Sequence, residues 1–160
     1  MTDTIPRSIV ADALGVGTDA LPEGDLPTER FGQRFMMFLR DTFDDDLRAH
    51  PEDWTAAVAS HLAEHNPALS LATLRATLAA AETPEDIAAV AGGPLSELIA
   101  LHGADLLPDL ETLSRTAPRF ALALSAVAPD GGSPLLWARV QAMTGSVLIE
   151  DDQIPGPGGL

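Results

Sequence analysis

His61, Glu64 and His65 form the pattern that comes nearest to a known chemistry, in the segment HLAEH. The segment matches H-x-x-E-H, in which two imidazoles one helical turn apart bind zinc and the glutamate activates a water molecule. A metal-dependent hydrolase is therefore one candidate function. Helical periodicity, however, places both histidines in or beside an apolar stripe and turns Glu64 away from it. Asn66 and Pro67 end the helix directly afterwards. We therefore predict two histidines at the boundary of a packed helix, with no metal site and no cofactor.

Other nucleophilic and phosphate-binding patterns are incomplete. His102 continues an apolar stripe, which is typical of a histidine packed at a core. Gly92 and Gly93 stand before Pro94 at a predicted helix start, where free N–H groups can bind phosphate. No predicted strand precedes them, and no lysine completes a phosphate-binding loop. No serine lies in a nucleophile-elbow motif. We therefore predict no catalytic residue and a protein that is not an enzyme.

The chain is strongly acidic, with 24 acidic and 9 basic residues and a formal net charge of -15 at pH 7. Such a surface repels nucleic acid and anionic lipid and attracts a basic protein. We therefore predict a non-enzymatic acidic protein-protein interaction domain, acting as an immunity or antitoxin-like neutraliser of a basic partner. A structural subunit of a larger assembly is a further alternative. The acids expected to contact the partner are Asp41, Asp44, Asp45, Asp46, Glu52 and Asp53.

The acidic run from Asp44 to Asp46 does not fit a calcium-binding loop. An EF-hand needs a glycine at its sixth position and a bidentate glutamate at its twelfth. Counted from Asp44, these places hold Ala49 and Thr55. We therefore interpret the run as a helix N-terminus or a solvated turn, and its acids are also among those expected to contact the partner.

Composition predicts the fold class. Hydrophobic residues make up 46% of the 160 residues, mostly alanine and leucine, whereas aromatic residues make up 4% and cysteine is absent. Small and medium aliphatic side chains favour helices over strands. We expect one all-α domain of short antiparallel helical hairpins over residues 28–145, either an irregular helical bundle or a short superhelical stack. Residues 1–27 are expected to form a flexible arm that adds little to the core, and residues 146–160 a flexible tail.

Capping residues and apolar stripes predict the individual helices. Thr28 begins a helix with a phenylalanine-rich stripe, and further helices are expected over residues 51–67, 69–81, 84–91 and 134–143. Between these, one helix should begin at Pro94 and stop at Gly103, a second should follow over residues 106–117, and a third should begin at Pro118.

No stretch approaches the roughly 18 apolar residues of a membrane helix. Residues 1–20 also lack the apolar run of a secretory signal. We therefore expect a cytoplasmic protein without membrane contact.

An ordered set of short motifs runs through residues 51–145: a Pro-x-x-Trp helix, a Gly-Pro-Leu turn, a His-Gly step and a Pro-x-Phe helix followed by a tryptophan. The residues that carry them are Pro51, Trp54, Gly93, Pro94, Leu95, Leu98, Ile99, His102, Gly103, Glu111, Ala117, Pro118, Arg119, Phe120, Trp137, Arg139 and Val140. In order and spacing they resemble an uncharacterised bacterial family of small all-helical domains. Ser96 departs from that family, which commonly has an acid there, and Ala128 replaces a frequent tryptophan. The resemblance implies an all-α fold; because the function of that family is unknown, it does not indicate any particular activity.

Overall fold

The computed structural model describes residues 3–43, 50–129, 131–144 and 154–160. Their regular structure is almost entirely helical. Strands are limited in these ranges to β1 (Thr4–Ile5) and β2 (Leu26–Pro27), which pair antiparallel with Thr4 opposite Pro27. The predicted all-α fold is therefore confirmed.

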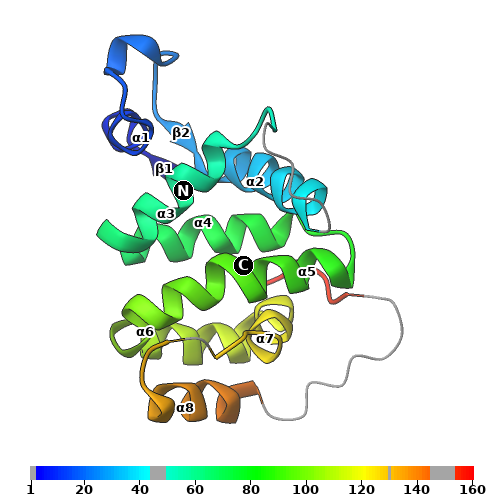
Figure 1. The fold of residues 1–160 in the computed structure, drawn as a ribbon. Coiled ribbons are helices and arrows are strands. Elements are labelled where there is room, and N and C mark those ends of the chain that lie inside the picture. The colour runs from blue at the N-terminus through cyan, green and yellow to red at the C-terminus, as the bar shows by residue number, and fades with distance from the viewer. Residues whose placement is uncertain (1–2, 44–49, 130, 145–153) are drawn as a thin grey trace.

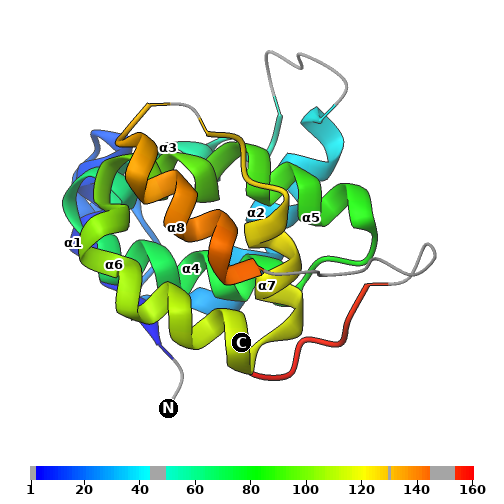
Figure 2. The same cartoon turned by 90° about the horizontal axis from the view of Figure 1, so that it is seen from below.

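The helices lie in successive layers, and each layer buries its apolar side chains against the next (Figure 1). α1 and α2 lie on one side of α3 and α4, and α5, α6 and α7 lie on the other. From below, α8 is seen to cross the outer side of α6 and α7 (Figure 2). The bounds are α1 (Arg7–Leu14), the 3-10 turn η1 (Thr18–Ala20), α2 (Thr28–Thr42), α3 (Trp54–His65), α4 (Pro67–Ala79), α5 (Pro84–Val90), the π-helical turn η2 (Ala91–Leu95), α6 (Ser96–Thr116), α7 (Pro118–Ser125) and α8 (Pro134–Thr144).

Several helices begin where the sequence signals place them. α2, α5 and α7 start at the predicted Thr28, Pro84 and Pro118. At α5, the Thr83 side chain accepts the Asp86 N–H, and the Asp86 carboxylate accepts the Thr83 N–H. This reciprocal capping box satisfies two backbone donors that the helix itself cannot pair.

Gly103 does not end a helix, contrary to the prediction of a stop there. α6 continues through it from Ser96 to Thr116. Gly103 is buried, and a Cβ added to it would lie 2.8 Å from Leu136 Cδ2 and 3.0 Å from Ile99 Cγ2. The missing side chain therefore lets α8 approach α6 closely, which explains the glycine within a helix.

Pro94 also lies inside a helical stretch instead of at a helix start. The π-helical turn η2 accommodates this proline, which has no N–H for the helical ladder. Ser96 donates both its backbone N–H and its hydroxyl to the Ala91 carbonyl, and its Oγ accepts the Ala128 N–H at 3.0 Å. The two positions that depart from the resembled family, Ser96 and Ala128, are thus in contact.

The joined elements α5, η2 and α6 form one helix of 33 residues, Pro84–Thr116. Among the described residues it is the one helix long and apolar enough, by length and composition, to cross a membrane. The expectation that no stretch reaches that threshold is therefore wrong. Half of the apolar window is buried inside the fold, and this burial accounts for its composition.

The N-terminal residues contribute side chains to the core, contrary to the prediction that residues 1–27 add little to it. Ile5 on β1 is fully buried, and Val10 and Ala11 of α1 are buried as well. The hydroxyl and N–H of Thr28 both donate to the Asp3 carbonyl, which fixes β1 at the start of α2. The pairing of β1 with β2 and the packing of α1 on α3 bury short apolar segments. These segments are too short to show a clear hydrophobic periodicity in the sequence.

The last described segment, residues 154–160, lies at the junction of α6 and α7. Ile154 and Leu160 are half-buried against the core, and the Pro155 carbonyl accepts the Arg119 Nε–H at 2.9 Å. The other residues of the predicted flexible tail that precede Ile154 lie outside the described residues.

Candidate functional site

Of the six acids predicted to bind a partner, the structure describes three. Asp44, Asp45 and Asp46 lie outside the described residues. Asp41 lies in the last turn of α2, and Glu52 and Asp53 directly precede α3. These three therefore come together at the α2–α3 junction, which also contains Arg34, His50 and Trp54.

His50 is a buried polar group of this junction, with a side chain that is 8% exposed. Its Nδ1 accepts the Glu52 backbone N–H at 3.0 Å, so the proton of a neutral ring lies on Nε2. Nε2 lies 2.8 Å from Asp41 Oδ2, and the ring stands edge-on to Phe38. An aspartate orients the catalytic imidazole in many hydrolases, but there the second ring nitrogen faces the nucleophile. Here both ring nitrogens are already paired, so His50 holds the junction together.

Glu52 has the same structural role. Its side chain is 12% exposed, Oε1 accepts from Arg34 at 3.0 Å and Oε2 accepts from Trp54 Nε1 at 2.8 Å. Both carboxylate oxygens are therefore used within the fold. Asp41 and Asp53 are exposed, and they are the two acids of the predicted set that present carboxylates to solvent among the described residues.

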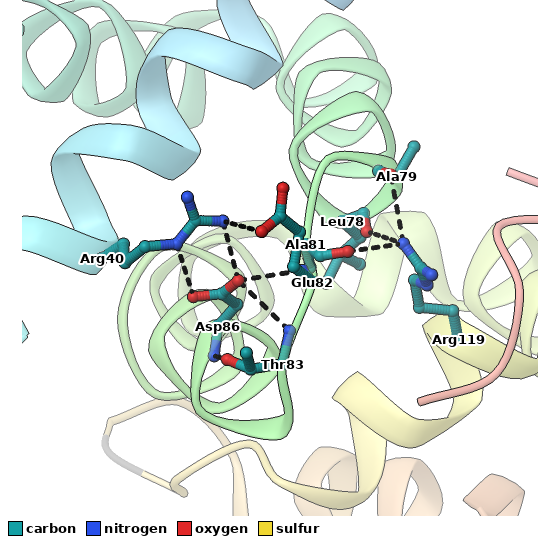
Figure 3. A network of polar contacts seen from close by, with 8 residues as sticks. All are labelled: Arg40, Leu78, Ala79, Ala81, Glu82, Thr83, Asp86 and Arg119. Carbon is teal, nitrogen blue, oxygen red and sulfur yellow. Dashed lines mark hydrogen bonds and ion pairs between the residues drawn. The ribbon is translucent and has the colours of Figure 1, made fainter. Parts of the chain in front are cut away.

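Arg40 and Asp86 form a bidentate ion pair between helices distant in sequence (Figure 3). Arg40 Nε donates to Asp86 Oδ1 at 3.1 Å, and its terminal nitrogen donates to Oδ2 at 2.9 Å. The Glu82 and Thr83 N–H groups donate to Oδ2 as well, at 2.9 and 3.3 Å. The pair ties the end of α2 to the start of α5, with an Asp86 side chain that is 3% exposed.

The protonation of this pair is set by opposing effects. Burial acts to raise the pKa of Asp86, but the hydrogen bond from Arg40, the Glu82 N–H, the charge of Arg40 and the Thr83 N–H together bring the pKa below its ordinary value. In return, the hydrogen bond to Asp86 raises the pKa of Arg40. Both groups are therefore ionised at neutral pH, as a structural ion pair requires.

Arg119 is buried on the other side of the same α4–α5 connection (Figure 3). One terminal nitrogen donates to the carbonyls of Leu78, Ala79 and Ala81, at 2.9, 3.1 and 3.1 Å. These acceptors lie at or just beyond the C-terminus of α4, where carbonyls lack intrahelical partners and a cation is favourable. Burial lowers the pKa of Arg119, although arginine stays charged at neutral pH. This arginine therefore caps α4.

The HLAEH motif ends α3, with Glu64 and His65 exposed and the intervening Leu62 and Ala63 buried. The ring centroids of His61 and His65 are 4.6 Å apart, and His65 Nε2 lies 3.7 Å from Glu64 Oε2. His61 is half-buried, as a boundary histidine should be, whereas the His65 side chain is 63% exposed. No group of three or more histidine, cysteine, aspartate or glutamate residues that could hold a metal ion occurs in the parts of the chain that the structure describes.

The arginines are mostly directed at partners within the fold. Arg34 and Arg40 pair with Glu52 and Asp86, and Arg139 lies 3.4 Å from Glu111. Arg7 and Arg119 donate to backbone carbonyls. By contrast, every acidic side chain in the described ranges is exposed except Glu52, Asp86 and Glu111. The described surface therefore carries more exposed acids than exposed arginines, although Arg30, Arg34, Arg40, Arg115 and Arg139 are exposed as well.

Comparison with known proteins identifies a family but no activity. Residues 43–147 match a family of unknown function, DUF6869. No curated protein and no solved structure gives a significant match. The matched segment contains the α2–α3 junction from His50 onward, the HLAEH motif, Asp86 and Arg119.

Proposed function

The chain belongs to DUF6869, a family of unknown function, and from its surface we propose that it is a non-enzymatic protein-protein interaction domain that binds a basic partner protein. An immunity or antitoxin-like neutraliser of a basic toxin is the role that such a domain would fill. The observation that carries the proposal is the imbalance of exposed charge: in the described ranges fourteen acidic residues are exposed, against the five arginines Arg30, Arg34, Arg40, Arg115 and Arg139. A surface of one sign accelerates encounters with a partner of the opposite sign.

Exposed apolar side chains near the end of α2 support a binding surface there. Met37 and Phe43 are 43% and 53% exposed, and Asp41 lies between them in the sequence. Methionine and aromatic residues are enriched in the centres of protein interfaces, whereas charged residues form the rim. The proposed contacts are therefore Met37 and Phe43, with Asp41, Asp53 and the acids at 44–46 as the charged rim. Glu52 is omitted because its oxygens already accept internal hydrogen bonds.

The test is co-purification from cells of the native host, with the full chain as bait. In the α2-face variant, the acids at positions 41, 44, 45, 46 and 53 are changed to asparagine. A matched control variant loses the same number of charges elsewhere through Glu64→Gln, Glu85→Gln, Glu97→Gln, Asp105→Asn and Asp109→Asn. Because both variants have the same net charge, a difference between them reports on the location of the charge.

We expect wild type and the control variant to retain one basic protein at physiological salt. The α2-face variant should lose it, and raised salt should release it from wild type, because surface charges are screened beyond roughly 10 Å at 0.1 M salt. Equal retention by all three proteins, or a partner without a basic surface, would contradict the proposal.

The alternative hydrolase has one favouring observation, the proximity of the His61 and His65 rings. It is separated from the interaction domain by metal analysis of the purified protein. We expect equal metal content in wild type and in the His61→Ala, His65→Ala double variant, because two imidazoles alone leave a catalytic zinc site short of its third protein ligand. Stoichiometric zinc that disappears in the double variant would favour the hydrolase.

A further inference from the structure

A cavity of about 390 Å³ lies between α1, the connection from α1 to α2, and the first turn of α3. This volume falls within the range of about 300–1,000 Å³ that is usual for small-molecule sites. The lining residues that matter most for binding are Arg7, Val10, Leu14, Leu26, Arg30 and Trp54. All of them except Trp54 precede residue 43, where the family match begins, so the cavity is formed mainly by the part of this chain outside that match.

The walls combine apolar side chains with two guanidinium groups. Val10 is buried, and Leu14 and Trp54 are half-buried. Trp54 is held in place by its indole N–H bond to Glu52 and by the edge of Phe31. An apolar body placed here would be desolvated against a rigid aromatic ring, which is the usual source of affinity for small ligands.

The guanidinium groups of the two arginines have N–H donors that are not all used within the described fold. Arg7 lines the cavity and donates through one terminal nitrogen to the Leu21 carbonyl at 2.7 Å; its Nε, which has no hydrogen-bond partner, is buried, so the terminal nitrogens are the donors that a ligand can reach. Arg30 is exposed and forms no ion pair with any described residue. Of the two acids that also line the cavity, Asp25 already accepts the Arg7 backbone N–H at 3.0 Å, and Glu23 is exposed to solvent.

We propose that this cavity binds a small apolar carboxylic acid. The hydrocarbon body lies against Val10, Leu14 and Trp54, and the carboxylate pairs with the guanidinium groups of Arg30 and Arg7. Guanidinium is the side-chain group best matched to a carboxylate, because its planar N–H donors bind both oxygens at once. The proposal is independent of the acidic protein-binding surface, since it concerns a separate apolar cavity lined by two arginines.

The first experiment compares three ligands that share one hydrocarbon chain, namely decanoate, decanol and decyltrimethylammonium. Calorimetric titration of the full chain gives the affinities. The chain has two tryptophans, so Trp54 becomes the sole fluorescent reporter in a Trp137→Phe variant and locates the binding. We expect decanoate to bind roughly tenfold or more tighter than decanol, because charge-assisted hydrogen bonds are about twice as strong as neutral ones. The ammonium ligand should bind weakest.

Two variants and one control complete the test. Arg30→Gln should reduce the affinity for decanoate to near that for decanol and leave decanol unchanged. Leu14→Phe should weaken all binding by filling the cavity, while Arg115→Gln, an exposed arginine on α6, should change nothing. The proposal is overturned if decanoate and decanol bind equally, if the ammonium ligand binds tightest, if no ligand changes the Trp54 emission, or if Arg30→Gln binds decanoate as wild type does.

Discussion

Gly32 marks a close approach between α2 and α4, and replacing it by alanine tests the helix packing of the fold. A Cβ at this position would lie 2.6 Å from the Ala76 carbonyl carbon and 2.7 Å from both the Ala76 oxygen and the Thr77 nitrogen. These are backbone atoms, which cannot rotate away. The Gly32→Ala variant must therefore push α2 and α4 apart by most of an ångström to reach an ordinary contact distance.

The expected change in the free energy of unfolding follows from two opposing effects. Alanine is favoured over glycine within a helix by about 1 kcal/mol. Overpacking costs about 1–3 kcal/mol and occasionally more, and a gap of about 0.5–1 Å forfeits a quarter to a half of the dispersion energy along the separated interface. The steric effect is larger because the clash is with backbone, so we expect a net loss of about 2 kcal/mol.

Two other glycines provide matched controls for urea denaturation followed by far-UV circular dichroism. Gly93→Ala meets no atom within 4 Å, so it should gain up to about 1 kcal/mol. Gly103→Ala meets the flexible Leu136 side chain, so its gain and loss should nearly cancel. A Gly32→Ala variant as stable as Gly93→Ala would refute the packing of α2 on α4.

Three further predictions concern the core and the buried charges. Leu98→Ala and Leu110→Ala should each lower the free energy of unfolding in urea by about 2–5 kcal/mol, because both side chains are fully buried and their truncation leaves a cavity; unchanged midpoints would show that these faces are exposed. Arg119→Met should cost about 2–4 kcal/mol and speed hydrogen exchange at the end of α4, because three carbonyls each lose a donor; protection equal to wild type would contradict this role. The folded pKa of Asp86 lies below its ordinary value of 3.8. The contribution of the ionised Asp86 to stability should therefore be complete above pH 3.8 and disappear as the pH falls through the folded pKa. An Arg40→Gln variant with the same acid unfolding curve as wild type would refute the pairing.

The sequence predicts the helical class and several helix starts because those depend on local signals. Pro84 and Pro118 act through backbone geometry within one turn, and Thr83 caps α5. Thr28, in contrast, begins α2 without capping it, because its hydroxyl donates to the Asp3 carbonyl. Gly103 misleads for a physical reason, since the same lack of a side chain that ends helices also permits a close approach of Leu136 on α8. Pro94 misleads similarly, because a π-helical turn takes up a proline that would otherwise begin a helix.

The polar contacts of the site could not be predicted because their partners are remote or belong to the backbone. Asp86 lies 46 positions from Arg40 and looks like an ordinary first-turn acid. The acceptors of Arg119 are carbonyls, which carry no signal in the sequence. His50 was missed because it pairs with Asp41 across the α2–α3 junction and with one backbone N–H. The prediction that Glu52 contacts a partner at the surface fails to anticipate that Arg34 and Trp54 donate to both of its carboxylate oxygens.

The central proposal, that the exposed carboxylates of this chain recruit a basic protein, is tested most directly by the rate of association with the co-purified partner as a function of ionic strength. We predict a rate constant that falls steeply as salt is added, and a much flatter dependence after Asp44, Asp45 and Asp46 are changed to asparagine with the circular dichroism of the helices unchanged. An association rate that responds neither to salt nor to these substitutions would contradict the proposal and leave the surface charge with a role in solubility alone.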